Sequence, residues 1–370
     1  MNATGPTVGP GASAENGDEA AAPAMRRTMR AIIYTDFGSA DVLRLEHVER
    51  PAIANDEVLV RVHAAGLDRG TWHFMAGQPY LFRLMGAGLR RPKNRVPGLD
   101  VAGTVVAAGS DVTRFEVGDA VFGISSGSFA EYAPAREDRL ARKPASLSFE
   151  QAAVVAVSGL TALQSLRDVG RVEPGQRVLI IGASGGVGTF AVQIAKASGA
   201  EVTGVCSSAK LEMVRSLGAD HVIDYTKDDF ANGSQRYDLI LDIGGNSSLS
   251  RLRRALTASG TLVLVGGEDG DRWTGGIGRQ LRAVALSPFV RQRLTMKIPN
   301  ENSADIERLG GLIEAGQLTP SIDKRYPLHE AADAMRQLEA GRVLGKIVLL
   351  VGPADCSSFT SAAVEADELV

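Results

Sequence analysis

The stretch RVLIIGASGGVGTFAVQIAKASG, residues 177–199, contains three glycines at intervals of three: Gly182, Gly185 and Gly188. An apolar run precedes them and an amphipathic run follows, so the pattern predicts a buried strand, a tight turn and a helix. In such a turn, one glycine permits the bend, another lets a pyrophosphate approach, and the third lets the helix pack on the strand. A purely structural turn is the alternative. A strand before, a helix after and a second strand next favour a dinucleotide site at the helix N-terminus.

The end of the following strand bears on which dinucleotide binds. An NAD site usually has an acidic residue there, about twenty residues after the glycines, which accepts a hydrogen bond from the ribose 2′-hydroxyl. This chain instead has Cys206, Ser207, Ser208, Ala209 and Lys210. Two hydroxyls and an ammonium can bind a 2′-phosphate, which predicts NADP(H). The alternative is that the serines cap the next helix and that the lysine is solvated.

The surrounding pattern predicts two kinds of domain. From residue 30 to about residue 124, short runs of β-branched residues are broken by Gly, Asp and Pro, which is typical of a small β domain. Residues 74–98 are interpreted as a long loop with one helical turn. From residue 177 onward strands alternate with helices, which indicates an α/β fold with a doubly wound parallel sheet. The helix, turn and strand over 326–351 either extend that sheet or return to the first domain.

The composition limits the classes of function. The chain has 370 residues, a net charge of −3 and 44% hydrophobic residues, which is ordinary for a globular protein and gives no reason to expect nucleic acid as partner. Two cysteines far apart exclude a disulfide framework and suit a cytoplasmic protein. No apolar run reaches the ~20 residues of a membrane span, so we expect no integral membrane association. Residues 1–28 and 353–370 are predicted to be disordered or flexible tails.

Several motifs resemble one family and occur in its order. They are GASGGVGTFAVQIAKASGAEVTGVCSS, LGADHVIDY, GLTALQSL, GSFAEY, VGDAVFG and GRVLGKIVLLV. They resemble the medium-chain dehydrogenase/reductase superfamily, nearest to its zinc-free quinone oxidoreductase branch, which includes zeta-crystallin-like proteins. The resemblance implies a GroES-like β domain over 29–155, a Rossmann domain over 156–300, and a segment over 301–352 that returns to the first domain. It also implies that the nicotinamide enters the cleft between the domains.

The sequence departs from the zinc-dependent relatives in this family. Asp68 stands where those relatives have a cysteine ligand, Leu99-Asp100 replaces His-Glu, and the four-cysteine structural lobe is missing. Zinc needs three or four converging donors, and His63 and His73 are better explained as a strand residue and a loop residue. We therefore expect no metal. Without a Lewis acid, the substrates that accept hydride most easily are quinones and α,β-unsaturated carbonyls.

The resemblance assigns cofactor contacts residue by residue. Thr161 is expected near the nicotinamide and Tyr225 near the adenine ribose phosphate. The pyrophosphate contacts are Ser184, Gly185, Gly186 and Val187, and three glycines at strand ends, Gly244, Gly266 and Gly267, complete the expected site with Ser207, Ser208 and Lys210. Lys346 either approaches the cofactor or is solvated before an edge strand.

Candidates for substrate contact lie in the first domain. The resemblance places Asp68 and Trp72 at the cleft, and the phenol of Tyr80 can donate to a developing oxyanion. Packing is the alternative role for both aromatic residues. The arginines of RLMGAGLRRPK and RQLRAVALSPFVRQRL predict a solvated face, or alternatively a site for an anionic or CoA-linked substrate.

These observations predict an NADPH-dependent reductase of small carbonyl, enone or quinone substrates. One alternative is a zinc-free alcohol or aldehyde dehydrogenase, and another is a cofactor-binding protein with a structural or regulatory role. A homodimer is expected, because family members commonly pair the edge strands of two Rossmann sheets and RLTMKIPN, residues 293–300, is a candidate edge strand. In the alternative, residues 275–294 cover that edge and the chain is a monomer.

Overall fold

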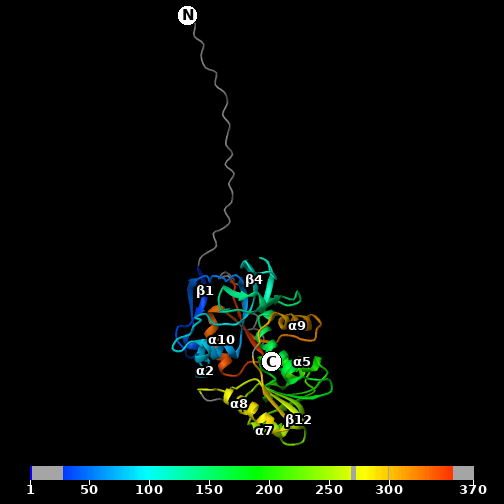
Figure 1. Cartoon of the computed structure of the whole chain (residues 1–370). Coiled ribbons are helices and arrows are strands. Elements are labelled where there is room, and N and C mark those ends of the chain that lie inside the picture. The colour runs from blue at the N-terminus through cyan, green and yellow to red at the C-terminus, as the bar shows by residue number, and fades with distance from the viewer. Residues whose placement is uncertain (2–27, 268–271, 299, 353–370) are drawn as a thin grey trace, which may run out of the picture.

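A computed structural model describes residue 1 and residues 28–267, 272–298 and 300–352. The predicted tails, 1–28 and 353–370, lie almost entirely outside these residues. Figure 1 shows two lobes: one contains the first strands together with the C-terminal part of the chain, and the other contains the middle of the chain. The chain therefore crosses between the lobes twice.

The first lobe is built on a mostly antiparallel sheet. Its strand order is β14-β15-β3-β4-β5-β7, β6 pairs with β3, and β1 and β2 form a separate pair. The strands are β1 (Thr28–Ile33), β2 (Arg44–Glu49), β3 (Glu57–Leu67), β4 (Asp100–Ala108), β5 (Ala120–Ile124), β6 (Tyr132–Arg136), β7 (Leu140–Arg142), β14 (Ile322–Pro327) and β15 (Lys346–Leu350). Because β15 pairs antiparallel with β3, the C-terminal segment completes this sheet.

The second lobe contains a six-stranded parallel sheet in the order β10-β9-β8-β11-β12-β13. Its strands are β8 (Arg177–Ile181), β9 (Glu201–Cys206), β10 (His221–Asp224), β11 (Tyr237–Asp242), β12 (Leu256–Leu264) and β13 (Arg293–Met296). In chain order this is the 3-2-1-4-5-6 arrangement of a Rossmann fold, with its switch point between β8 and β11. The predicted α/β class, a doubly wound parallel sheet beside a GroES-like domain, is confirmed.

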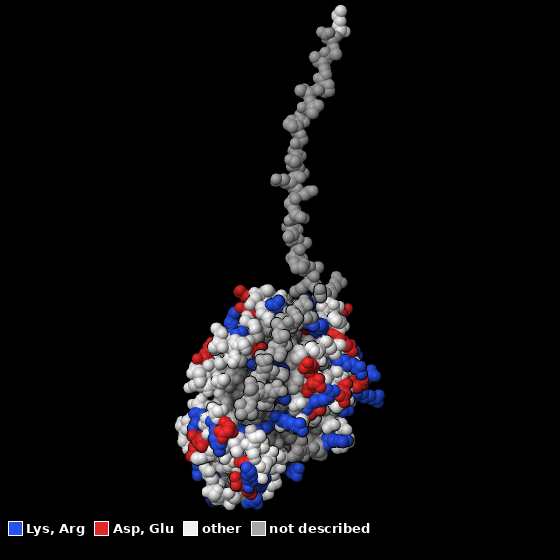
Figure 2. Space-filling view, turned by 180° about the vertical axis from the view of Figure 1, so that it is seen from behind, with Lys and Arg blue, Asp and Glu red and all other residues white. Residues whose placement is uncertain are grey.

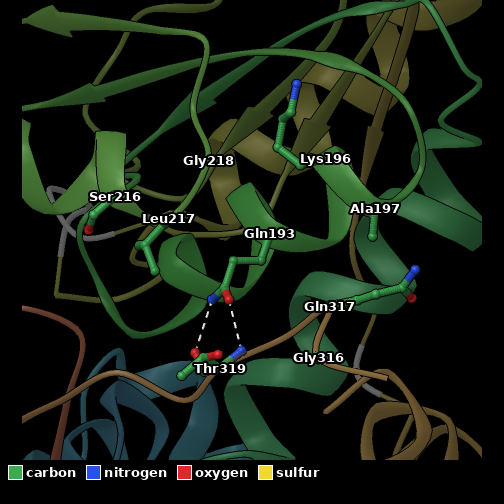
Figure 3. Close-up of a pocket in the computed structure, with 9 residues that line it drawn as sticks. All are labelled: Gln193, Lys196, Ala197, Ser216, Leu217, Gly218, Gly316, Gln317 and Thr319. Carbon is green, nitrogen blue, oxygen red and sulfur yellow. Dashed lines mark hydrogen bonds between the residues drawn. The ribbon is translucent and has the colours of Figure 1, made fainter. Parts of the chain in front are cut away.

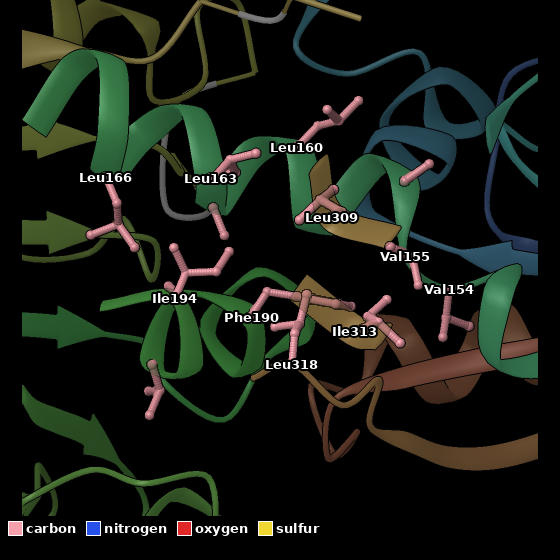
Figure 4. Packing of buried hydrophobic residues seen from close by; sticks show 14 of the residues in the cluster. Val154, Val155, Leu160, Leu163, Leu166, Phe190, Ile194, Leu309, Ile313 and Leu318 are labelled. Carbon is pink, nitrogen blue, oxygen red and sulfur yellow. The ribbon is translucent and has the colours of Figure 1, made fainter. Parts of the chain in front are cut away.

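Helices cover this sheet because its strands are apolar on both faces. They are α4 (Ala156–Gln164), α5 (Gly186–Ala197), α6 (Leu211–Ser216), α7 (Leu249–Ala255) and α8 (Ile277–Leu286). Helix α9 (Ser303–Glu314) packs on α4 and on β7, while α3 (Phe149–Ala152) and α10 (Ala331–Glu339) pack on the strands of the first lobe. Figure 4 shows side chains from α4, α5 and α9 meeting in one cluster, with Phe190 of α5 fully buried near Leu309 and Ile313 of α9. This packing fixes the position of α5, the helix that follows the glycine turn.

The segment after β3 contains more helix than the sequence predicted. Helix α1 (Arg69–Ala76) is followed by α2 (Tyr80–Phe82) and a π-helical turn over Arg83–Ala87. Asp68 caps α1 by accepting from the Thr71 N–H at 2.7 Å, and Gly77 ends that helix with a left-handed φ of 60°. The prediction of one helical turn between 74 and 98 was wrong because these caps were not recognised as such.

Charge is distributed unevenly over the surface. Figure 2 shows one face, on which Lys and Arg side chains alternate with Asp and Glu. Within the described part of the chain, none of the helices has both the length and the hydropathy that crossing a bilayer requires.

Candidate functional site

The glycine turn lies at the switch point of the parallel sheet. Gly182 follows β8 with φ of 87°, a left-handed conformation that favours glycine. A Cβ on Gly188 would stand 2.1 Å from the Gly182 carbonyl oxygen, so only glycine lets α5 approach the turn this closely. The predicted roles of these two glycines, the bend and the close packing of helix on strand, agree with this geometry.

The N-terminus of α5 is open toward a ligand. Its N-cap is Gly185, so no side chain accepts a hydrogen bond from the first N–H groups of the helix. A Cβ on Gly185 would meet nothing closer than the Gly182 oxygen at 3.5 Å. The N–H groups of Gly186 and Val187 therefore start a helix whose partial positive charge is uncompensated, and this cradle fits the pyrophosphate of a dinucleotide.

The same turn also contacts the first lobe. Ser184 is buried, and its carbonyl accepts from the Gly345 N–H at 2.9 Å, while Gly185 and Gly345 form a parallel β-bridge. A Cβ on Gly186 would stand 2.9 Å from Cδ of Lys346, so the lysine stem packs directly on the turn. The cofactor turn and the C-terminal strand of the other lobe are thus in contact.

Lys346 is buried and paired. Its Nζ lies 2.9 Å from Oδ2 of Asp100, and the two side chains are 2% and 0% exposed. Asp100 Oδ1 accepts from the Val157 N–H at 2.7 Å, near the start of α4. Burial raises the pKa of Asp100, the Lys346 ammonium opposes that rise, and the Asp68 carboxylate adds to it. The alternative of a solvated Lys346 is therefore wrong.

At the adenine end, the structure adds a carboxylate that the sequence analysis missed. Ser208 donates to Asp224 at the end of β10, and hydrogen bonds from Ser208 and then Thr226 lower the pKa of Asp224 to about 2. Lys210 donates to the carbonyls of Gly341 and Val343, at 3.2 and 2.9 Å. The structure thus brings the predicted residues together but gives Ser208 and Lys210 protein partners.

No hydrogen bond is made by the side chains of the other two residues at this end, Ser207 and Tyr225, within the described part of the chain. Ser207 is the N-cap of a short 3-10 turn over Ser208–Lys210, yet its side chain makes no capping hydrogen bond. Tyr225 follows β10 and is 59% exposed. Among the described residues, these two side chains are accessible for a phosphate or an adenine ring.

A second buried ion pair closes the carboxyl ends of β11 and β12. Arg279 of α8 donates to Asp242 Oδ2 at 2.6 Å and to the carbonyls of Ser247 and Gly266 at 2.7 and 3.1 Å. Burial raises the pKa of Asp242, and Arg279 opposes that rise. A Cβ on Gly267 would stand 2.3 Å from Cα of Gly276, so the chain approaches itself closely before α8. Gly244 follows β11 beside Gly182.

The three residues predicted for substrate contact have different surroundings. Asp68 is buried and accepts from both the N–H and the hydroxyl of Thr71. The Trp72 indole donates to Glu339 at 2.9 Å, which connects α1 to α10. Tyr80 packs its ring edge on Trp273 of the other lobe, and its N–H donates to the Arg272 carbonyl at 2.9 Å. Tyr80 thus lies at the contact between the lobes, and its phenol oxygen has no hydrogen-bond partner among the described residues.

Thr161 and the two histidines have local partners. The Thr161 hydroxyl donates to the Val157 carbonyl within α4 at 2.7 Å, which leaves its oxygen free to accept. His63 lies 3.0 Å from the Thr104 hydroxyl and stacks on Phe149, and His73 contacts the Gln78 carbonyl. In the described ranges, no three His, Cys, Asp or Glu side chains group as metal ligands would.

A pocket in the second lobe lies away from this site. It measures about 600 Å³ and is lined by α5, the turn after α6 and the loop after α9. Figure 3 shows the Gln193 amide bridging the backbone of Thr319, and Lys196 nearby binds Asp220. The pocket is lined by none of the residues of the glycine turn, so it does not add to the dinucleotide site.

Sequence reasoning missed the partners of the buried charges. Asp100 and Lys346 are 246 residues apart, and Asp242 and Arg279 are 37 apart. One signal was available: a carboxylate at the start of an apolar strand such as DVAGTVV must find a partner if that strand is central. Which cation supplies that partner depends on the tertiary fold.

Comparisons with known proteins agree with this geometry. Residues 54–145 match the alcohol dehydrogenase GroES-like domain and residues 217–349 a zinc-binding dehydrogenase model. The chain is 33% identical to 2-methylene-furan-3-one reductase of Solanum lycopersicum, over 87% of this chain and 79% of that one. It is 32% identical to the chloroplastic NADPH-dependent alkenal/one oxidoreductase of Arabidopsis thaliana, over 87% and 80%. The quinone oxidoreductase structure from Coxiella burnetii superimposes with a TM-score of 0.79 at 30% identity, over 88% of this chain and 100% of that one.

Breaking the buried ion pair on one side should destabilise the protein strongly. Lys346→Met leaves the Asp100 carboxylate buried without a cation, which costs about 3–5 kcal/mol. Asp100→Asn in the same chain removes that charge and keeps an acceptor for Val157, so the double variant should lose less than the sum of the single variants. Urea unfolding of the four proteins measures this, with exposed Lys324→Met as the matched control. Additive losses would contradict a direct pairing.

Proposed function

We propose that this chain, which belongs to the medium-chain dehydrogenase/reductase superfamily in its quinone oxidoreductase-like branch, reduces quinones or α,β-unsaturated carbonyls with NADPH. The open N-terminus of α5, beside the contact between the lobes, is the observation on which the proposal rests. The names of the tomato reductase and the Arabidopsis oxidoreductase, which describe enone reduction, support the substrate class. A small-molecule substrate enters between the lobes.

The residues at the carboxyl ends of the parallel strands contact successive parts of the cofactor. The N–H groups of Gly186 and Val187 hold the pyrophosphate, with the Ser184–Gly185 backbone forming the wall of the cradle. Tyr225, Ser207 and Lys210 surround the adenine ribose. Gly244, Gly266 and Gly267, at the ends of β11 and β12, leave room for the nicotinamide half, and Thr161 offers an acceptor oxygen.

The reaction needs orientation more than acid–base chemistry. A bound NADPH supplies hydride from its nicotinamide ring. The chain holds the substrate against that ring beside Tyr80 and Trp273, whose rings meet at the contact between the lobes. Negative charge develops on the substrate oxygen, and the Tyr80 hydroxyl is positioned to donate to it. Asp68 and Trp72 act as positioning residues, since they hold α1, which precedes Tyr80.

The donor set around Asp68 and Asp100 supports a mechanism without metal. Each carboxylate is already used: Asp68 accepts from Thr71, and Asp100 accepts from Lys346 and Val157. A metal ligand would have to give up these partners inside the protein. The match to a model described as a zinc-binding dehydrogenase therefore gives the fold, and we assign no zinc to this chain.

The decisive experiment is NADPH consumption with a panel of quinones and enones, before and after chelation. We expect turnover with members of both classes and no loss after chelator treatment, because Asp68 and Asp100 already have protein partners. Aliphatic alcohols with NADP⁺ and NAD⁺ test the dehydrogenase alternative. Preferential oxidation of alcohols, or NADPH binding without any turnover, would overturn the proposal. Chelator-sensitive activity would overturn only its metal-free part.

The proposal also specifies NADPH rather than NADH as the cofactor. Lys210 has three N–H groups and two carbonyl partners, so one proton remains for a 2′-phosphate, with Ser207 beside it. Burial lowers the pKa of Lys210, whose Nζ lies beside the two carbonyl oxygens that accept from it. Asp224 acts in the opposite direction, because its ionised carboxylate repels a phosphate near Ser208.

Two variants separate these opposing charges. Lys210→Met should weaken NADPH binding about 10- to 100-fold, through loss of a charge-assisted hydrogen bond, and affect NADH far less. Asp224→Asn removes the repulsion and should strengthen NADPH binding selectively. Fluorescence titration with both cofactors gives the dissociation constants. Equal affinity of the unmodified protein for NADPH and NADH, or equal losses in Lys210→Met, would refute the assignment of Lys210 to the phosphate.

We also propose a homodimer and retain the expected cytoplasmic location. Strand β13 pairs with β12 on one side and has no strand on its other side in the described sheet. Light scattering should give twice the chain mass, and Met296→Pro, which removes an N–H on the side of β13 that faces away from β12, should shift the protein toward monomer. Met296→Val, which keeps that N–H, serves as the control. A native mass of one chain excludes the dimer, and an unchanged Met296→Pro dimer excludes this edge.

A further inference from the structure

Ser158 of α4 has a buried hydroxyl without a hydrogen-bond partner. The residue is 3% exposed, and its Oγ makes no hydrogen bond with any residue in the described part of the chain. A hydroxyl within a helix often donates to the carbonyl four residues before it, as Thr161 does to Val157 in this same helix. Burying a hydroxyl without such a bond costs free energy, so the surroundings of Ser158 must explain why it is there.

The hydroxyl lies beside the first residue of α5. A Cβ added to Gly186 would stand 3.2 Å from Ser158 Oγ and 2.9 Å from Cδ of Lys346. Helix α4 packs along α5, and Figure 4 shows Leu160 of α4 and Phe190 of α5 in their shared cluster. Ser158 therefore borders the cradle at the N-terminus of α5 from the side of α4.

A second serine shows what distinguishes this position. Ser165, the C-cap of α4, also has a hydroxyl without a partner, and its oxygen is sealed from solvent. The oxygen of Ser158 is not sealed in this way, so the small exposed area of the residue includes its hydroxyl. A ligand in the cradle can therefore reach Ser158, whereas Ser165 is enclosed by the protein.

The groups around Ser158 favour an anion as the ligand. The first N–H groups of α5 have no side-chain acceptor, because the N-cap is Gly185. The nearest ammonium, that of Lys346, already binds Asp100 at 2.9 Å. A ligand that accepts from the N–H groups and from the hydroxyl together would satisfy all of them, and phosphate oxygens have this property. A hydrogen bond to such a charged oxygen is also stronger than one to a neutral acceptor.

We infer that Ser158 donates a hydrogen bond to the pyrophosphate of the bound dinucleotide, alongside the N–H groups of Gly186 and Val187. Thr161 follows three residues later, on the same face of α4, so this helix presents two hydroxyls to successive parts of the cofactor. The inference rests on the dinucleotide site of the proposed function. It depends neither on the substrate nor on the choice between NADPH and NADH, because both cofactors contain the pyrophosphate.

Ser158→Ala tests this contact by removing the hydroxyl alone. We expect the dissociation constants of NADPH and NADH to rise by a similar factor, about tenfold or more, because the lost bond is to a charged oxygen. Ser158→Cys, which keeps the shape of the side chain but is a weak donor, should act in the same direction. Ser165→Ala removes the enclosed hydroxyl near the same helix and serves as the matched control, with both constants unchanged.

Fluorescence titration of the full chain measures these constants, and thermal unfolding checks that each variant is folded. ADP-ribose, which has the pyrophosphate and no nicotinamide, identifies the part of the cofactor that Ser158 contacts. Its competition with NADPH should weaken in Ser158→Ala by the same factor. Unchanged binding of NADPH in Ser158→Ala, or equal losses in Ser165→Ala, would overturn the inference. Loss of affinity for NADPH but not for ADP-ribose would assign Ser158 to the nicotinamide half and also overturn it.

Turnover with a water-soluble quinone separates this inference from the reductase proposal. The contact with the pyrophosphate is the same before and during hydride transfer, so Ser158→Ala should raise the KM for NADPH and leave kcat nearly unchanged. Tight NADPH binding without turnover in the unmodified chain would overturn the reductase and leave the binding comparison valid. Normal turnover together with unaltered cofactor affinity in Ser158→Ala would overturn the role of Ser158 alone. An unmodified chain that binds neither dinucleotide would overturn both.

Discussion

Lys346 Nζ lies 2.9 Å from Asp100 Oδ2 in a region that water does not reach, and three parts of the chain meet there. Asp100 begins β4, its other oxygen accepts from Val157 before α4, and the Lys346 stem packs on Gly186. An unpaired charge at this depth costs several kcal/mol, so the ammonium and the carboxylate hold β15 and β4 of the first lobe in a fixed relation. The cradle for the dinucleotide is thereby held at the contact between the lobes.

The second buried ion pair has a consequence on the outer surface. Arg279 must point inward to reach Asp242, and residues two apart on a helix lie about 200° apart around its axis. Leu281 therefore points outward, and Val284 and Phe289 follow on the same side. The orientation of α8, with Leu281 on its outer side, thus follows from closing the sheet edge with an arginine.

Local patterns predicted most of the fold because they depend on short stretches of chain. Gly182 has a left-handed φ, and Gly188 lets α5 approach the turn closely. The apolar strands indicate a parallel sheet that is covered on both faces. Pairings between distant residues were not predictable in the same way. Asp224 reaches Ser208 because β10 lies beside β9, and Lys346 reaches Asp100 because β15 returns to β3. The helices after Asp68 were missed because an Asp followed by Arg-Gly-Thr does not distinguish a helix cap from a loop.

The charged side chains around the glycine turn are largely neutralised by the protein itself. Lys346 is used by Asp100, Arg279 by Asp242, and two of the three protons of Lys210 by carbonyls. Backbone N–H groups at the start of α5 are therefore the main uncompensated positive charge for a pyrophosphate. Such groups bind NADP and NAD equally well, because both contain the same pyrophosphate. Discrimination between the two must then arise at the far end of β9 and β10, where one remaining N–H of Lys210 and the hydroxyl of Ser207 oppose the carboxylate of Asp224.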